Sequence, residues 1–404
     1  MIKVLIIESG SFKNIGGAAK DSLELYKYLS KKPDMQVEIY GSFEELGYKS
    51  RTSIDSVYAK KFDVLMLNSI RDVPIAEKYI SLHGKVACVY VDRGDVLTHY
   101  AHAPAKRLLG KALGLIESRI EPSRLDKATT EIASRSDFKA VKAARDYASK
   151  VYAIRLFERL KKIMSCYVAI NAEQALLARK VLKLKAIEYI PIAPHKEFKK
   201  IKVKKDYAGA LYVGRLEETQ KNVSFMIKGV YRTKKEHKEL AGKELLRIIG
   251  EGPDEQYYKA MASRLGLQSN VSFLGFKAYG ELVKQYNNCG FLVSCSRWES
   301  FGRVFIEAMM CGVPVLLNDR NNKLVSIEPE RYVVQDRVTG LVYHYNSLRD
   351  FADKFYALYS DSKLRAKLSK NAYAFAKSRF SIEMTYERYY ELFKGLASRQ
   401  AQGS

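Results

Sequence analysis

The chain has few residues of the kinds that build disulfide-bonded or metal-bound proteins. Its 404 residues include only 5 cysteines, 6 histidines and 1 tryptophan. No CxxC pair is present, and no histidine lies at metal-ligand spacing from any of the cysteines, which are Cys88, Cys166, Cys289, Cys295 and Cys311. No base lies nearby in the sequence to activate a catalytic thiol. We therefore expect reduced and mostly buried cysteines that pack as small hydrophobic residues.

Long hydrophobic runs are also absent. No apolar stretch reaches the roughly 20 residues that a helix needs to cross a bilayer. The first residues, MIKVLIIESG, enter an apolar run with no small-residue cleavage site, which favours a buried strand over a signal peptide. With 47% hydrophobic and 28% charged residues, the composition is that of a soluble globular protein and excludes a disordered chain. We expect a cytoplasmic protein.

Acidic residues are scarce relative to basic ones. Lys and Arg number 69 against 45 Asp and Glu, which gives a formal net charge of +24. Such an excess favours a polyanionic partner, such as nucleic acid, an anionic membrane face or phosphorylated small molecules, but a solvated lysine-rich surface gives the same count. The basic residues are dispersed and no nucleic-acid-binding module is recognisable, so nucleic-acid binding is kept only as an alternative.

The length suggests two domains of roughly 200 residues each. Apolar strand candidates alternate with stretches of helical spacing, such as Ala18–Ser30, and this alternation is typical of doubly wound parallel sheets. A proline and a basic run at 192–206 predict the linker between the domains. The strand candidates are Lys3–Ile7, Val37–Tyr40, Val64–Leu67, Val86–Val91, Cys166–Ile170 and Ala186–Ile190, then Gly209–Val213, Leu245–Ile249, Val271–Leu274, Phe291–Val293 and Pro314–Leu317.

One segment interrupts the alternation. Residues 101–162 have helical spacing, few turn signals and a net charge of +8, which predicts a helical insertion in the first domain. The insertion is either a solvated decoration or a basic surface that meets anionic lipid or a charged acceptor.

Two glycine-containing turns follow strands in the second half. The sequence GRLEETQKN (214–222) places Arg215 and Lys221 in a turn opened by Gly214, at the edge where open α/β sheets bind ligands. Two cations there can hold a diphosphate and offset the charge that grows on it, although two surface cations in a loop would look the same. The turn IIGEGPDEQ (248–256) contains Gly250 and Gly252, which allow a close approach of the backbone to a ligand.

The most informative stretch is SRWESFGRVFIEAMMCGVPVLLND (296–319). Glu299 lies just before a predicted helix and Glu307 two turns into it, on a side otherwise apolar. Glu307 can be an exposed helix residue, but a carboxylate facing the core requires a partner, which favours a ligand role. The amides of Ser300, Phe301 and Gly302 are helix-start donors suited to a phosphate or a sugar hydroxyl.

These motifs together resemble a known family. The block ESFGRVFIEAMMCGVPV is similar to the two-glutamate signature of the retaining family-4 glycosyltransferases of the GT-B fold. GRLEETQKN, IIGEGP and VTGLVY (338–343) resemble the neighbouring motifs of that family in the same order, so the match is specific over about 206–345. IGGAAKDSLELYKYLS (15–30) resembles the glycine-rich acceptor-side loop more loosely. The insertion has no counterpart in the family.

The resemblance implies two Rossmann-like α/β domains that face a central cleft. The acceptor-side domain would span 1–195 and the nucleotide-sugar-binding domain 206–380. A final helix at 381–404 would cross back to the first domain. The implied reaction is transfer of a sugar, with retention of configuration, from a nucleotide-diphosphate sugar to a glycan or a lipid-linked acceptor.

The resemblance also implies roles for the residues of the motifs. Arg215 and Lys221 would bind the donor diphosphate, and Glu307 would hold the ribose hydroxyls. Glu299 and the amides of the following residues would bind hydroxyls of the transferred sugar.

Further roles fall on glycines and on one acid. Gly16 and Gly17 would bring the first loop close to donor and acceptor, and Gly214 and Gly252 would belong to the donor site. Many family members have a histidine at the end of the fourth N-terminal strand. This chain has Asp92 at about that place, where it could assist the chemistry electrostatically.

No cofactor or metal is required by this interpretation, because the sequence has no DxD-type pair that would anchor a metal. A GT-B-fold epimerase or phosphorylase is the second alternative, beside nucleic-acid binding. The expected partners are a nucleotide-sugar donor, a glycan or lipid-linked acceptor, and an anionic membrane face contacted by the insertion.

Overall fold

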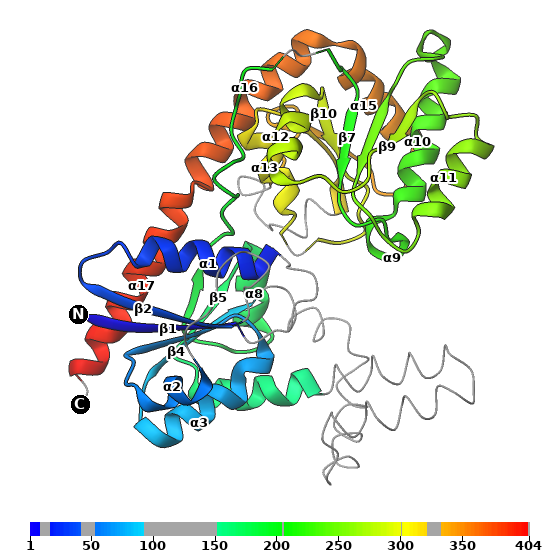
Figure 1. Cartoon of the computed structure of the whole chain (residues 1–404). Helices are drawn as coiled ribbons and strands as arrows, with labels where there is room; N and C mark the ends of the chain where they lie inside the picture. The colour runs from blue at the N-terminus through cyan, green and yellow to red at the C-terminus, as the bar shows by residue number, and fades with distance from the viewer. Residues whose placement is uncertain are drawn as a thin grey trace, which may run out of the picture. The chain divides into compact units, whose positions relative to one another are not determined.

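The computed structural model describes two compact units (Figure 1). The first unit spans Met1–Ile170, Gln174–Ile190 and Arg388–Ser404, and the second spans Asn171–Glu173 and Pro191–Glu387. The structure describes residues 1–8, 17–41, 53–92, 152–203, 206–299, 301–320 and 333–402.

The first unit is built on a parallel sheet of six strands in the order β2-β1-β3-β4-β5-β6. Its central strands are buried along their whole length, because helices cover both faces of such a sheet. The strands are β1 (Ile2–Glu8), β2 (Met35–Gly41), β3 (Val64–Leu67), β4 (Ala87–Asp92), β5 (Cys166–Ala169) and β6 (Ile187–Tyr189).

Helices flank this sheet. They include α1 (Gly17–Leu29), α2 (Ile54–Ala59), α3 (Val73–His83), α8 (Ala172–Lys180) and the part of α17 (Ile382–Gln402) that follows Glu387. Residues 152–163 are also helical. The ring of Phe157 packs edge-on against those of Tyr90 and Tyr167, so this stretch covers the sheet. The rest of the predicted insertion, up to residue 151, lies outside the described residues.

The second unit has a parallel sheet of six strands in the order β12-β11-β10-β7-β8-β9. Read from β9, this is the strand order of the Rossmann fold, in which the chain reverses direction across the sheet between its first and fourth strands. The strands are β7 (Ala210–Val213), β8 (Leu246–Ile249), β9 (Val271–Phe273), β10 (Phe291–Val293), β11 (Val315–Asn318) and β12 (Gly340–Tyr343).

The helices of the second unit alternate with these strands. They are α9 (Glu218–Lys221), α10 (Val223–Glu236), α11 (Glu255–Arg264), α12 (Tyr279–Asn288), α13 (Arg303–Met310), α15 (Leu348–Ser360), α16 (Ser362–Arg379) and the start of α17. Together the two sheets confirm the predicted α/β class with two doubly wound parallel sheets. The predicted strands agree with the observed ones to within about a residue at most ends, whereas β12 was predicted only as part of the VTGLVY motif.

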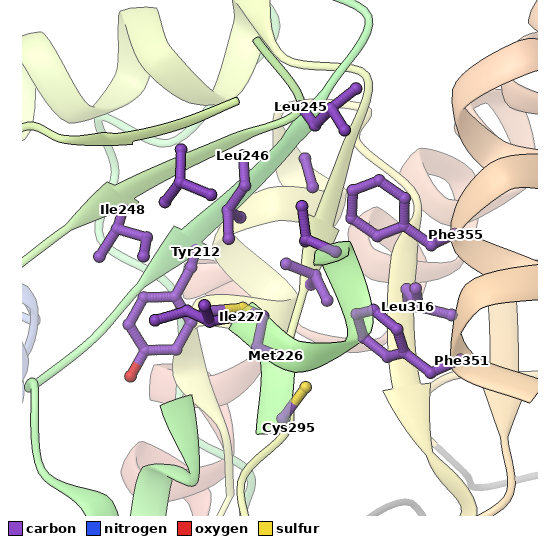
Figure 2. Close-up of a cluster of buried hydrophobic side chains, with 14 of the residues drawn as sticks. Tyr212, Met226, Ile227, Leu245, Leu246, Ile248, Cys295, Leu316, Phe351 and Phe355 are labelled. Atoms are coloured by element: carbon purple, nitrogen blue, oxygen red, sulfur yellow. The ribbon is translucent and has the colours of Figure 1, made fainter. Parts of the chain in front are cut away.

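The core of the second unit lies between its sheet and the pair α10 and α15 (Figure 2). Phe351 and Phe355 of α15 belong to one buried cluster with Met226 and Ile227 of α10 and Leu316 of β11. A Cβ at Gly229 would lie 2.3 Å from the ring of Phe351, which explains a glycine in the middle of α10. This packing fixes the sheet whose carboxyl edge carries the candidate site.

Candidate functional site

The strand order of the second unit defines where a ligand can bind. β7 and β10 are neighbours at the point where the chain reverses direction across the sheet. In open parallel sheets, ligands bind beyond the carboxyl ends of the two strands at this point. The segments that follow these strands are residues 214–222 and 294–302, which contain most of the predicted site residues of this unit.

An ion pair joins the two segments. The Lys221 Nζ lies 2.5 Å from Oε1 of Glu299, and their side chains are only 18% and 10% exposed. The Ser296 hydroxyl donates to the same carboxylate oxygen at 2.7 Å. The structure thus brings together Lys221, which was predicted to bind the diphosphate, and Glu299, which was predicted to bind the sugar.

Lys221 does not lie in a loop, as the sequence suggested, because it is the last residue of the single-turn helix α9. The carboxylate of Glu217 caps this turn by accepting from the amides of Thr219 and Gln220, at 2.8 and 3.2 Å. The pKa of Glu217 is lowered, because these hydrogen bonds outweigh burial, which alone raises it. Asn222 ends the turn in the left-handed region, with φ of 54°.

Arg215 is exposed, and it lies close to the end of β7. Its carbonyl accepts from the hydroxyl of Tyr212 at 3.0 Å, which anchors the backbone beneath an outward-facing guanidinium. A Cβ at Gly214 would lie 2.9 Å from that hydroxyl. Gly214 therefore makes room for the Tyr212 anchor.

The structure assigns Gly250 and Gly252 a different contact from the one that the sequence suggested. A Cβ at Gly250 would lie 2.0 Å from the carbonyl oxygen of Gly214, and one at Gly252 would lie 2.2 Å from that of Leu216. The Leu216 amide donates to the carbonyl of Glu251 at 2.9 Å. Both glycines are needed where this backbone passes the turn after β7, whatever they contact in a complex.

Glu307 is buried on α13, with 5% of its surface exposed. This excludes the alternative of an exposed helix residue. The Tyr286 hydroxyl donates to its Oε2 at 3.4 Å. Burial, then the charge of Glu307, raises the pKa of Tyr286 well above its usual value. A carboxylate kept this far from water requires polar partners, and ligand hydroxyls would be suitable ones.

The start of α13 is shaped by a glycine and an aromatic residue. Gly302 caps the helix with φ of 73°, and the Phe305 ring occupies the space that a Cβ would need. The Phe301 side chain is buried edge-on against Phe380, so only its backbone can face a ligand. Ser300 lies outside the described residues.

The 295–299 segment also carries Trp298, the only tryptophan in the chain. Its side chain is exposed, and its carbonyl accepts from Nε2 of Gln220 at 3.1 Å. The neighbouring Arg297 donates to the carbonyl of Thr219 in α9 and to the side chain of Asn222, the residue that caps α9. Sequence reasoning missed Arg297, because its partners lie nearly eighty positions away and no motif marks the pairing.

Asp92 belongs to the first unit and ends β4, fully buried. It accepts a hydrogen bond from Tyr167 of β5, and burial, then the Asp92 charge, raises the pKa of that tyrosine well above its usual value. Glu8, at the end of β1, accepts from the Ser22 hydroxyl at 2.7 Å. Two buried acids, Glu8 and Asp92, therefore lie at the carboxyl ends of strands of the first sheet. Sequence reasoning missed Glu8, although an acid that ends an apolar strand is a usable signal.

The remaining predicted site residues are glycines of the first loop. Gly17 is the first residue of α1, and Gly16 lies outside the described residues.

All five cysteines are free and buried, as expected. Burial raises the pKa of the Cys295 thiol to about 12, which makes it a poor nucleophile at neutral pH. Within the described ranges no group of three or more His, Cys, Asp or Glu residues could hold a metal ion. The same ranges contain no helix that is both long and apolar enough to span a bilayer.

Comparison with known proteins identifies the second unit. Residues 195–375 match the family model of the glycosyl transferases group 1. An uncharacterized glycosyltransferase of Methanocaldococcus jannaschii is 32% identical over 137 residues, which are 34% of this chain and 36% of that protein. The lipopolysaccharide 1,6-galactosyltransferase of Salmonella typhimurium is 31% identical over 144 residues, 35% of this chain and 36% of that one. The chain thus spans little more than a third of the length of these relatives.

Solved structures extend the likeness to the whole chain. Sucrose-phosphate synthase from Thermosynechococcus elongatus superposes with a TM-score of 0.69 at 14% identity, covering 99% of this chain and 100% of that one. Anabaena HepE, in complex with UDP and glucose, gives 0.63 at 16% identity, covering 98% and 100%. The chain therefore has the GT-B fold, and its residues 195–375 match the glycosyl transferases group 1 family.

Proposed function

We propose that the chain is a retaining glycosyltransferase that moves a sugar from a nucleotide-diphosphate sugar to a glycan or lipid-linked acceptor. The observation that carries the proposal is the pair Lys221 and Glu299 beyond the ends of β7 and β10. A cation and a carboxylate held together at that point suit a donor that is a diphosphate at one end and a polyol at the other.

In this proposal the donor lies along the carboxyl edge of the second sheet. Lys221 and Arg215 bind the diphosphate, and Glu307 accepts from the ribose hydroxyls. Glu299 and the amides after it hold the transferred sugar. The complex of Anabaena HepE with UDP-glucose supports a uridine nucleotide as the first donor to test. GDP sugars are the next to test.

The bond from the anomeric carbon to the diphosphate oxygen breaks, and a bond to the acceptor oxygen forms on the same face. The acceptor proton passes to the leaving diphosphate. Negative charge grows on that diphosphate in the transition state, so fixed cations stabilise it more than the ground state. The sequence has no DxD-type pair, so the proposal involves no metal ion. Asp92 assists electrostatically from the acceptor side.

A thermal-shift screen of UDP and GDP sugars tests donor binding, because a ligand at 100 times its Kd adds about 2.7 kcal/mol of stability. Nucleotide release is then measured with and without candidate acceptors. We expect release that depends on the acceptor and a product of retained configuration. Full release without acceptor would favour an epimerase or a hydrolase, and no stabilisation by any nucleotide sugar would overturn the proposal.

We further propose that the enzyme works on the cytoplasmic side, as a peripheral protein at an anionic membrane face. The basic segment at 101–162 and the net charge of +24 support this location.

A further inference from the structure

We infer that Arg297 is a positioning residue, which fixes Lys221 by closing the carboxyl end of the single-turn helix α9. The inference rests on the proposed function, because Lys221 is the residue through which Arg297 would act.

Helix α9 has only 4 residues. A helix this short is unstable alone, because nucleation fixes several residues for a single hydrogen bond. The carbonyl of Glu218 accepts the amide of Asn222 at 3.2 Å, and the carbonyls that follow it carry the negative end of the helix dipole. Yet Lys221 is the last residue of this turn, so its position depends on what holds the turn in place.

Arg297 adds side-chain hydrogen bonds at the carboxyl end of α9. Its Nη1 donates to the carbonyls of Glu218 and Thr219, the latter at 2.9 Å. Its Nη2 donates to Oδ1 of Asn222, the residue that ends the turn, at 2.9 Å. A guanidinium offers several donors in a fixed plane, so it can hold all three acceptors at once.

The same guanidinium is held by a carboxylate. Its Nη2 donates to Oε1 of Glu218 at 3.1 Å. Glu218 also accepts from the amide and the hydroxyl of Ser224, at 3.1 and 2.7 Å, and thereby caps α10. The Tyr258 hydroxyl donates to this carboxylate at 3.1 Å. Arg297 is thus tied, through Glu218, to two long helices of the second unit.

The backbone of the 295–299 segment runs alongside α9. The Arg297 amide donates to the carbonyl of Gln220 at 2.7 Å, and Gln220 returns a hydrogen bond to the carbonyl of Trp298. Two residues further on, Glu299 meets Lys221. Arg297 therefore sets the distance between the turn after β7 and the segment after β10, which is the distance that a diphosphate sugar has to fit.

The test compares Arg297→Lys and Arg297→Gln with matched changes at Arg247. Arg247 makes a similar ion pair, with its Nη2 2.7 Å from Oε2 of Glu244, and is 21% exposed against 32% for Arg297. UDP affinity by calorimetry, kcat and KM for the best donor, and thermal unfolding are measured for each variant. Arg297→Lys keeps the charge and loses the planar fork, so it separates position from electrostatics.

We expect both Arg297 variants to lower kcat by about 10- to 100-fold, as displaced catalytic groups do. KM should change less, and the Arg247 variants should keep wild-type kcat. In a Lys221→Gln background, Arg297→Gln should add less than about threefold, because residues that act as one unit are not additive.

If Arg297→Gln lowers kcat in the Lys221→Gln background by as much as it does in the wild type, the inference is overturned. A kcat loss in the Arg247 variants equal to that in the Arg297 variants would also overturn it. If Arg297→Gln fails to fold, Arg297→Lys alone decides, since wild-type kcat in a folded variant contradicts a positioning role. A wild-type protein that binds no nucleotide would contradict the proposed function instead.

Discussion

At the scale of residues, the two side chains predicted to bind the diphosphate, Arg215 and Lys221, have different surroundings in the folded protein. Arg215 faces solvent on an anchored backbone, whereas Lys221 neutralises a carboxylate that is only 10% exposed. A donor diphosphate would compete with Glu299 for Lys221. Removing either cation should slow the reaction, but only the loss of Lys221 leaves a nearly buried charge without its partner.

We therefore expect Arg215→Ala and Lys221→Ala each to lower turnover by about 10²–10³-fold, as the loss of one preorganised donor does. Lys221→Ala should also lower the free energy of unfolding by about 1–3 kcal/mol. Arg215→Ala should leave it unchanged. Initial rates at saturating donor and denaturant unfolding measure the two effects. Full turnover in either variant would show that its cation does not act in the transition state.

Glu307 gives a prediction about binding. Glu307→Ala should weaken nucleotide affinity by about 1.5–3 kcal/mol, the usual worth of a hydrogen bond to a charged group. Calorimetry with UDP measures it. Glu281→Ala on the exposed face of α12 is the control, since its carboxylate is 63% exposed. An unchanged affinity in the Glu307 variant would remove this residue from the donor site.

At the scale of elements, the sequence predicted strands that are continuous apolar runs and missed elements that lack such a run. Buried parallel strands are continuous apolar runs, so Val64–Leu67 and Phe291–Val293 were predicted to the residue. The strand β12 begins at Gly340, directly after Thr339, so only the VTGLVY motif marked it. The turn α9 has only 4 residues and none of them is buried, so it shows no amphipathic pattern. The 295–299 segment that contacts it lies nearly eighty positions away in the sequence. For the same reason the sequence named Lys221 and Glu299 separately but could not pair them.

The turn after β8 gives a prediction at this scale. Gly250→Ala would place a Cβ 2.0 Å from the Gly214 carbonyl at a φ of 131°, which an alanine rarely adopts. We expect the free energy of unfolding to fall by about 2–4 kcal/mol, because backbone strain adds to overpacking. Gly280→Ala in α12 is the matched control. A Cβ there meets nothing within 4 Å, and alanine should stabilise the helix by up to about 1 kcal/mol. Equal stabilities of the two variants would contradict this account.

At the scale of the whole molecule, charge is the property that the fold leaves unexplained. Few of the 69 basic residues lie in the strands of the two sheets or among the residues of the candidate site. The basic segment at 101–162 lies outside the residues that match the family model, which are 195–375. An anionic membrane offers about 1 kcal/mol for each nearby Lys or Arg, and salt screens this attraction.

We expect the wild-type protein to sediment with anionic vesicles at low salt and to be released at high salt. Neutralising Lys139, Lys142 and Arg145 together should lower the bound fraction and leave nucleotide affinity unchanged. The control neutralises Lys363, Lys367 and Lys370, which are exposed on α16 of the second unit. Wild-type protein that stays in the supernatant at low salt would exclude the membrane role. Equal losses in the two triple variants would assign the binding to net charge alone.

Trp298 provides an intrinsic fluorescent probe of the candidate site. A chain with 28 tyrosines and 1 tryptophan gives, under selective excitation of indole, emission from one position only. That position lies between Arg297 and Glu299, with its ring exposed to solvent and its carbonyl tied to α9. The colour and intensity of this emission follow the polarity around the ring. The unmodified protein can therefore report, without any attached dye, how quickly this segment responds when a nucleotide sugar is mixed in.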